Sequence, residues 1–222
     1  MKKQMKHLLM AMVSAVLAVS ILTGCSGKPT AEDAEAYVQA VMDLMCKGDY
    51  DHSIKIADVE EGQESALRDQ VISDAMDDLG TIDISDSVRE SFRDVLDTAL
   101  TKCKYSIVDS EGADDGGYDV SVKIEPIILF DGLEDELKNE LSDTLSDEEQ
   151  VAAMSERELN DLVYSTMIKL MAERLEEPAY DAPETVKVHY GPLPDQGKNV
   201  YGVSEEDGEK LGSFLFSTKG LE

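Results

Sequence analysis

The sequence has no tryptophan, few aromatic residues and a deficit of basic residues. Its 20 lysines and arginines face 48 acids, so the formal net charge is −28 at pH 7. A field of that sign repels nucleic acid and anionic lipid headgroups, so we expect no nucleic-acid partner. It favours a highly soluble surface or one that binds cations. Long apolar runs are also scarce, and the longest lies near the N-terminus at residues 8–22.

That N-terminal segment is unlike the rest of the chain. Three lysines within the first six residues precede the uncharged run from Leu8 to Leu22. About fifteen apolar residues are too few to cross a bilayer, which takes roughly 20, but they match the core of a secretory signal peptide. We therefore predict export with removal of residues 1–24. Loss of the three lysines would take the net charge from −28 to −31.

The apolar run leads into Leu22, Thr23, Gly24 and Cys25: an aliphatic residue, two small ones and a cysteine. This order resembles the lipobox of bacterial lipoproteins. The resemblance implies cleavage between Gly24 and Cys25, a diacylglyceryl group on the Cys25 thiol, and in some lipoproteins a further N-acyl chain. Two acyl chains hold a protein stably on a membrane, whereas one gives marginal binding. The alternative is an ordinary secretory signal followed by an incidental cysteine.

Residues 25–29 then form a short tether, which spans at most about 17 Å when extended. The remaining residues, 30–222, suffice for one domain of ordinary size. We therefore expect a single extracytoplasmic domain held close to the membrane, on its outer face.

Helical patterns begin at Thr30, where Thr30 and Asp33 have the spacing of a capping box. Apolar residues at helical spacing predict helices from there to Gly48, from Leu67 to Gly80, and from Asp86 to about Ala99. A further run, 131–177, predicts one long helix or a short and a long one, because it contains two more capping signals. Ser204 with Asp207 predicts a terminal helix.

Strand patterns occur in two places. From Tyr118 to Glu125 apolar and polar residues alternate without exception, as in a strand with one face on a core and one in water. Residues 103–108 are its predicted antiparallel partner, joined by a loop at 109–117. Residues 186–190 and 199–203 form a second predicted hairpin.

The order of elements predicts an α+β fold, with an antiparallel sheet of about four strands in two hairpins. Five or six helices cover it, after a cleaved N-terminal signal helix. In element order the mature chain resembles the cystatin-like and nuclear-transport-factor-like α+β domains of many Firmicutes lipoproteins.

Cys46 and Cys103 are the two cysteines that the anchor would leave. In an exported chain two cysteines can pair, and a helix packed on the sheet could bring them together. The alternative is a pair of small buried thiols. The pattern leaves both open.

An acidic segment rich in glycine offers a candidate cation site. Asp109, Glu111, Asp114 and Asp115 carry the oxygen ligands that calcium prefers, although their spacing is not that of an EF-hand. A solvated acidic hairpin tip is the alternative, and any calcium bound there would be weak. The histidines of the mature chain, His52 and His189, lack the partners of a zinc site, and we expect His189 to be exposed on a polar strand face.

The catalytic and cofactor-binding motifs that we sought are absent: G-x-S-x-G, S-x-x-K with its companions, H-E-x-x-H, the P-loop and the dinucleotide fingerprint. We therefore expect a non-enzymatic module with no cofactor beyond the lipid. It would bind a protein or a small ligand near the membrane. The alternatives are a solute receptor for a transporter and, third, an enzyme with its site in a cone-shaped cavity.

Overall fold

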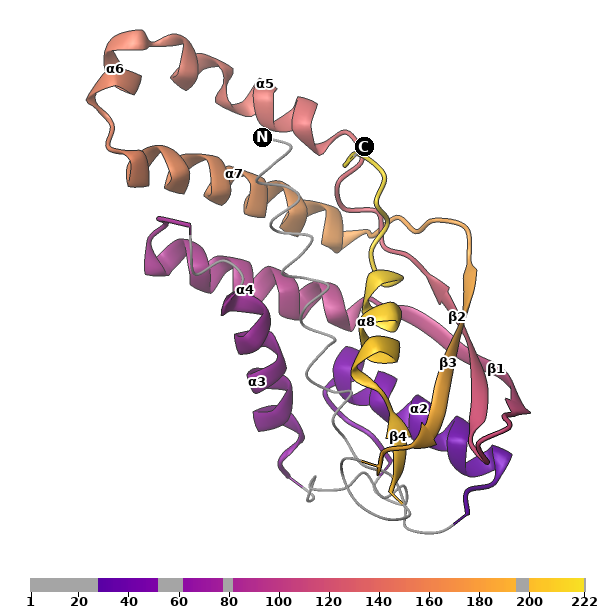
Figure 1. The fold of residues 1–222 in the computed structure, drawn as a ribbon. Helices are drawn as coiled ribbons and strands as arrows, with labels where there is room; N and C mark the ends of the chain where they lie inside the picture. Colours follow the sequence, from indigo (N-terminus) through magenta and orange to yellow (C-terminus); the bar gives the residue numbers. More distant parts are fainter. Residues whose placement is uncertain (1–27, 52–61, 78–81, 195–199, 222) are drawn as a thin grey trace.

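The computed structural model describes residues 28–51, 62–77, 82–194 and 200–221. In this part of the chain four strands form one antiparallel sheet, ordered β1-β2-β3-β4, together with seven helices (Figure 1). The predicted α+β class and the sheet of four strands are therefore confirmed. In chain order the elements are α2 (Ala31–Lys47), α3 (Glu64–Asp77), α4 (Asp86–Thr101), β1 (Lys104–Gly112), β2 (Tyr118–Glu125), α5 (Leu133–Ser146), α6 (Glu148–Ala153), α7 (Glu156–Glu176), β3 (Glu184–Pro192), β4 (Tyr201–Val203) and α8 (Glu205–Ser213).

The sheet has one buried and one polar face. Strand β2 has the bounds that its alternating sequence predicts, and it pairs with β3 from Tyr118 opposite Tyr190 to Ile124 opposite Glu184. Val120, Val122 and Ile124 are fully buried, and Val188 and Val186, which lie opposite the two valines on β3, are buried as well. The intervening side chains form the polar face, which carries lysines, acids and His189.

Strand β1 is longer than predicted. We expected a strand ending at Val108 and a loop over 109–117, but β1 continues to Gly112. The reason is a β-bulge between Ile107 and Asp109, which absorbs one residue and lets the ladder resume with Asp109 opposite Ser121. Asp109 and Glu111 therefore lie on a strand and not in a flexible loop.

Helices α2 and α8 cover the buried face of the sheet (Figure 1). The predicted capping box of Thr30 and Asp33 opens α2, and Gly48 ends it in the left-handed conformation that glycine adopts without strain. Tyr37 of α2 packs on Tyr190 of β3, with ring centroids 4.9 Å apart. This pairing joins the helix to the middle of the sheet.

The segment 131–177 forms three helices, so the described residues hold seven helices where we expected five or six. Ser155 and Glu158 make the predicted capping box that starts α7. The other predicted cap, at Ser146, is wrong: Ser146 is the last residue of α5, and extended backbone at Asp147 separates it from α6. Helices α5 and α7 run side by side, with α4 along α7, as an arm that extends beyond the sheet (Figure 1).

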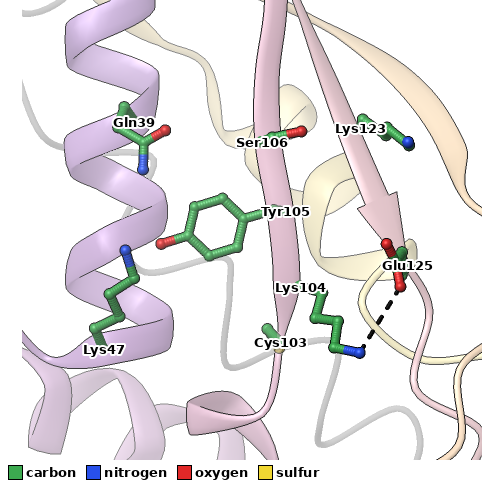
Figure 2. A pocket seen from close by; sticks show the side chains of 8 residues that line it. All are labelled: Gln39, Lys47, Cys103, Lys104, Tyr105, Ser106, Lys123 and Glu125. Atoms are coloured by element: carbon green, nitrogen blue, oxygen red, sulfur yellow. Dashed lines mark ion pairs between the residues drawn. The ribbon is translucent and has the colours of Figure 1, made fainter.

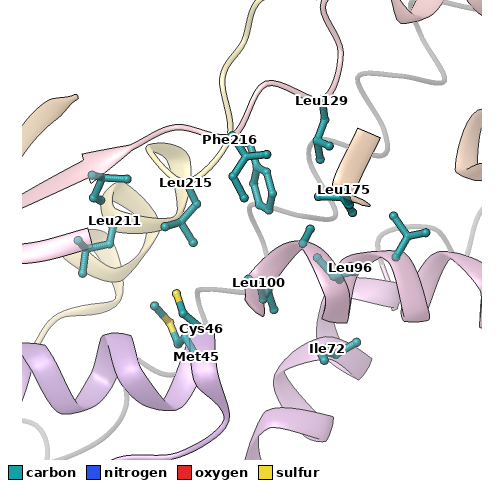
Figure 3. Close-up of a cluster of buried hydrophobic side chains, with 14 of the residues drawn as sticks. Met45, Cys46, Ile72, Leu96, Leu100, Leu129, Leu175, Leu211, Leu215 and Phe216 are labelled. Atoms are coloured by element: carbon teal, nitrogen blue, oxygen red, sulfur yellow. The ribbon is translucent and has the colours of Figure 1, made fainter. Parts of the chain in front are cut away.

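The buried apolar side chains of the described residues form one cluster that runs from the sheet into the arm. Figure 3 shows Leu211 of α8 and Leu215, just after that helix, above Met45 and Cys46 of α2, with α4 and its Leu100 beside them. The C-terminal end of α2 is therefore embedded between α4 and α8, and its position relative to β1 is set by core packing.

Candidate functional site: a lysine-lined groove beside strand β1

A groove of about 460 Å³ lies where the C-terminal half of α2 faces the beginning of β1 (Figure 2). Strand β1 lies at the edge of the sheet, since β2 is its only partner among the strands that the structure describes. The groove takes side chains from α2, from β1 and the residue before it, and from the end of β2. They are Gln39, Lys47, Cys103, Lys104, Tyr105, Ser106, Lys123 and Glu125.

Helix α2 and strand β1 run in opposite directions, and two contacts fix their alignment. Ser110 Oγ donates to Glu35 Oε1 at 2.6 Å near one end, and the Tyr105 hydroxyl donates to Asp43 near the other. The second contact forms the floor of the groove. Tyr105 points toward α2 because it belongs to the buried side of the sheet, opposite Ile124.

Asp43 organises this floor. Its Oδ1 atom accepts hydrogen bonds from Tyr105, from Gln39 Nε2 at 3.1 Å and from Lys47 Nζ at 2.5 Å. Partial burial raises the pKa of Asp43, but the hydrogen bonds from Lys47, Tyr105 and Gln39 outweigh it, so the net pKa is lowered. Burial, and then the bond to Asp43, raise the pKa of Tyr105. The pair is a carboxylate and a neutral phenol at neutral pH.

Three lysines line the groove although the chain as a whole is strongly acidic. Lys47 is held by Asp43. The Lys104 ammonium lies 3.7 Å from the ring centroid of Tyr180 and 3.9 Å from Glu125 Oε2. Lys123 is exposed and has no hydrogen-bond or ion-pair partner among the described residues. The groove can therefore offer at least one free ammonium group to an anion.

Cys46 and Cys103 meet behind this groove as free thiols. Cys46 is 1% exposed, whereas Cys103 is half-buried and lines the groove. The hydrogen bond with Cys103, and then burial, raise the pKa of Cys46 well above its ordinary value. The structure thus brings together the two residues that we considered as a disulfide pair, and it shows them unbonded.

The acidic residues that we considered for calcium lie at the opposite end of α2 and are distributed differently from the prediction. Asp109 and Glu111 are on β1, and Glu111 pairs with Lys187 at 2.5 Å. Asp114 and Asp115 are in the turn, where Asp115 accepts from the Gly117 N–H at 2.9 Å. Among the described residues, no three or more histidine, cysteine, aspartate or glutamate side chains are grouped so as to hold a metal ion.

His189 joins this turn to β3. Its Nδ1 lies 2.8 Å from Asp119 and its Nε2 2.9 Å from Asp115, an arrangement that we call the His189 clamp. The side chain lies on the polar strand face, as predicted, but it is only 36% exposed. Burial lowers its pKa, while the bonds with Asp119 and Asp115 raise it, and the net shift is upward. The clamp is a local ion-pair network and not a metal site.

Sequence reasoning did not identify the groove. The alternation in β2 placed Lys123 and Glu125 together on a polar face, but nothing local connected them with Lys47, which lies on a helix far away in the chain. Gly24, Cys25 and His52 lie outside the described residues. Within the described residues, no helix is both long and apolar enough to cross a membrane.

Comparisons with known proteins give one similar fold. No family model matches the chain, and no curated protein matches it in sequence. The crystal structure of a candidate lipoprotein (ycdA) from Bacillus subtilis subsp. subtilis str. 168 aligns with a TM-score of 0.55 and 13% sequence identity. The alignment covers 83% of this chain and 56% of that chain, so this chain spans little more than half of that protein's length. At this identity the likeness concerns the fold alone.

Proposed function

We propose that this chain is an extracytoplasmic lipoprotein, held on the membrane by lipid at Cys25, and that it acts without catalysis by binding an anionic ligand in the groove beside β1. The observation that carries the binding role is the presence of three lysines in the lining of one groove of a protein with a net charge of −28.

The order of Leu22 to Cys25 supports the anchor, since it resembles a lipobox, and the similar fold of ycdA belongs to a candidate lipoprotein. The first described residues, Lys28 and Pro29, enter α2 at the end that lies beside the β1–β2 turn. The groove lies along the other half of this helix of 17 residues, from Gln39 to Lys47, about 12–24 Å from its start. Under this proposal the groove faces away from the lipid and is open to soluble or wall-bound ligands.

Charge supports an anionic ligand. Acids elsewhere on the surface repel anions, so a local excess of ammonium groups makes the groove the favoured place for one. Lys123 is available without breaking an internal ion pair, and Lys104 has a long ionic contact of 3.9 Å with Glu125 besides its contact with the Tyr180 ring. The neighbouring Gln39 and Ser106 side chains can donate hydrogen bonds to carboxylate or phosphate oxygens.

A labelling experiment tests the anchor. Cells expressing the full chain are grown with a palmitate analogue, and the labelled protein is detected after membrane fractionation. We expect label on the wild-type protein and none on Cys25→Ala. Equal labelling of the two proteins, or a wild-type protein without label, contradicts the anchor.

A thermal-shift experiment tests the groove, with inorganic phosphate, citrate and an oligoglutamate peptide as probes. A probe that binds at about 100 times its dissociation constant adds about 2.7 kcal/mol to stability. We expect stabilisation of the wild-type protein and its loss in Lys123→Glu.

The matched control is Lys169→Glu on α7, which makes the same change in charge at a residue outside the groove that is 60% exposed. It should retain the shift. No stabilisation by any probe, or equal loss in both variants, contradicts anion binding in the groove.

A further inference from the structure

The pair of thiols at the junction of α2 and β1 is built as a site of covalent modification. Cys46 lies on the core side of α2, and Cys103, the residue before β1, packs against the same core. The Cys103 thiol also donates to the Ala99 carbonyl at 3.7 Å, which ties its side chain to the end of α4. Cys103 lines the groove together with Lys47, the residue that follows Cys46, and the two thiols contact each other, so they are neighbours in space.

Each cysteine is the immediate neighbour of a groove lysine. Cys46 precedes Lys47 on α2, and Cys103 precedes Lys104 on β1. A bond between the sulfurs would therefore tie together the two backbone segments that carry these lysines. Both segments contribute side chains to the groove.

We propose that Cys46 and Cys103 form an intramolecular disulfide in the exported protein, and that this bond strengthens ligand binding in the groove. The effect on the groove rests on the proposed function, whereas bond formation needs only exposure to an oxidising compartment. The co-reactant is a disulfide, either a small molecule or an extracytoplasmic thiol–disulfide oxidoreductase.

The two sulfurs have different roles in the reaction. Cys103 is half-buried and faces the groove, so its thiolate attacks the incoming disulfide, and one thiol of the co-reactant leaves. Cys46, which solvent does not reach, then attacks the Cys103 sulfur and releases the second thiol. The protein loses two protons and two electrons, and the co-reactant disulfide takes them up and becomes two thiols.

The bond would affect binding through preorganisation. In the reduced protein α2 and β1 are held together beside the groove by non-covalent contacts. The hydrogen bond between Tyr105 and Asp43 is one of them. A covalent link holds Lys47 and Lys104 at one separation before the ligand arrives. Binding to the oxidised protein then no longer includes the conformational-entropy cost of immobilising about one side chain. Removal of that cost lowers the dissociation constant about three- to tenfold.

The experiment uses the full lipid-anchored chain purified in detergent. It is incubated with oxidised glutathione or with dithiothreitol, denatured, labelled with a maleimide and mapped by mass spectrometry. We expect the oxidised sample to lose label at Cys46 and at Cys103 together and to yield a peptide that contains both. Retention of label at both residues, or links between separate chains, overturns the proposal.

Two variants test the order of attack. Cys46→Ala should accumulate glutathione on Cys103, because no second thiol can displace it. Cys103→Ala should keep an unmodified Cys46, which the core shields. Glutathione on Cys46 of that variant would overturn the assigned roles. Circular dichroism checks that both variants are folded.

The last measurement compares inorganic phosphate and citrate binding by the oxidised and reduced wild-type protein. Tighter binding by the oxidised form supports the proposal, and equal dissociation constants overturn its effect on the groove. If neither form binds either probe, the proposed function fails as well, while the peptide map still decides whether the disulfide forms.

Discussion

The end of α2 at Gly48 allows a prediction whose size follows directly from the contacts there. Gly48 has a φ of 70°, and a Cβ atom added to it would lie 2.8 Å from Nη1 and 3.2 Å from Cδ of Arg68. Arg68 is only 9% exposed, and its Nη2 atom contacts both the carboxylate of Asp97, at 3.0 Å, and its carbonyl oxygen, at 3.1 Å. The substitution Gly48→Ala therefore perturbs both the backbone and a buried guanidinium.

The two effects differ in size. A left-handed conformation destabilises a residue with a Cβ atom by roughly 1–2 kcal/mol. Displacement of Arg68 weakens bonds to a charged group, each of which contributes about 1.5–3 kcal/mol. We expect Gly48→Ala to lower the free energy of unfolding by about 3–4 kcal/mol.

Gly116 provides the matched control. Its φ is 86°, but nothing lies within 4 Å of a Cβ atom added there. Gly116→Ala should therefore lower the free energy of unfolding only by the cost of the left-handed conformation, about 1–2 kcal/mol. Urea unfolding followed by circular dichroism measures both losses. In an Arg68→Ala background the loss from Gly48→Ala should fall to that of the control.

Equal losses for Gly48→Ala and Gly116→Ala in the wild-type background would refute this reasoning. They would mean that the Arg68 side chain moves aside without weakening its contacts to Asp97.

Three further predictions concern the core, the thiols and pH. Phe92→Ala, at a fully buried residue, should lower the free energy of unfolding by about 3–5 kcal/mol, whereas Val108→Ala, at a residue 55% exposed, should change it by no more than about 0.5 kcal/mol in chemical denaturation. Oxidation of Cys46 and Cys103 closes a loop of about 57 residues, so calorimetry should show a stabilisation of about 4 kcal/mol, or roughly 10 °C, that dithiothreitol reverses. Folding raises the pKa of His189 above its ordinary value of 6.5, so the stability that it contributes is complete below about pH 6.5 and is lost as the pH rises through the folded pKa. His189→Gln should therefore destabilise the protein more at about pH 5.5 than at about pH 8.5; the same loss at both would contradict the His189 clamp.

Local patterns predicted most of the elements. The alternation from Tyr118 to Glu125 gave β2 its bounds, because period-two burial is a property of the strand itself. The capping box at Thr30 and the glycine at Gly48 gave the ends of α2 for a similar reason, since caps act on backbone groups within a few residues. The errors at β1 and α5–α7 arose where a bulge or a short break changed the period.

The candidate site could not be predicted in this way. Tyr105 and Asp43, which form the floor of the groove, are 62 residues apart, and His189 is 70 residues from Asp119. For each of these residues, the local sequence pattern predicts only the face of the helix or strand on which the residue lies. The partner opposite that face depends on how the elements pack.

The sequence by itself determined the elements, the acidic surface and the expectation of a lipid anchor at Cys25, because these follow from residue order and composition over short stretches. Only the tertiary structure decided that Lys47, Lys104 and Lys123 share a groove and that Cys46 meets Cys103. Packing of the shared core sets these contacts. The hydrophobic effect that drives this packing is non-directional, so it does not specify from the local sequence which distant side chains come into contact.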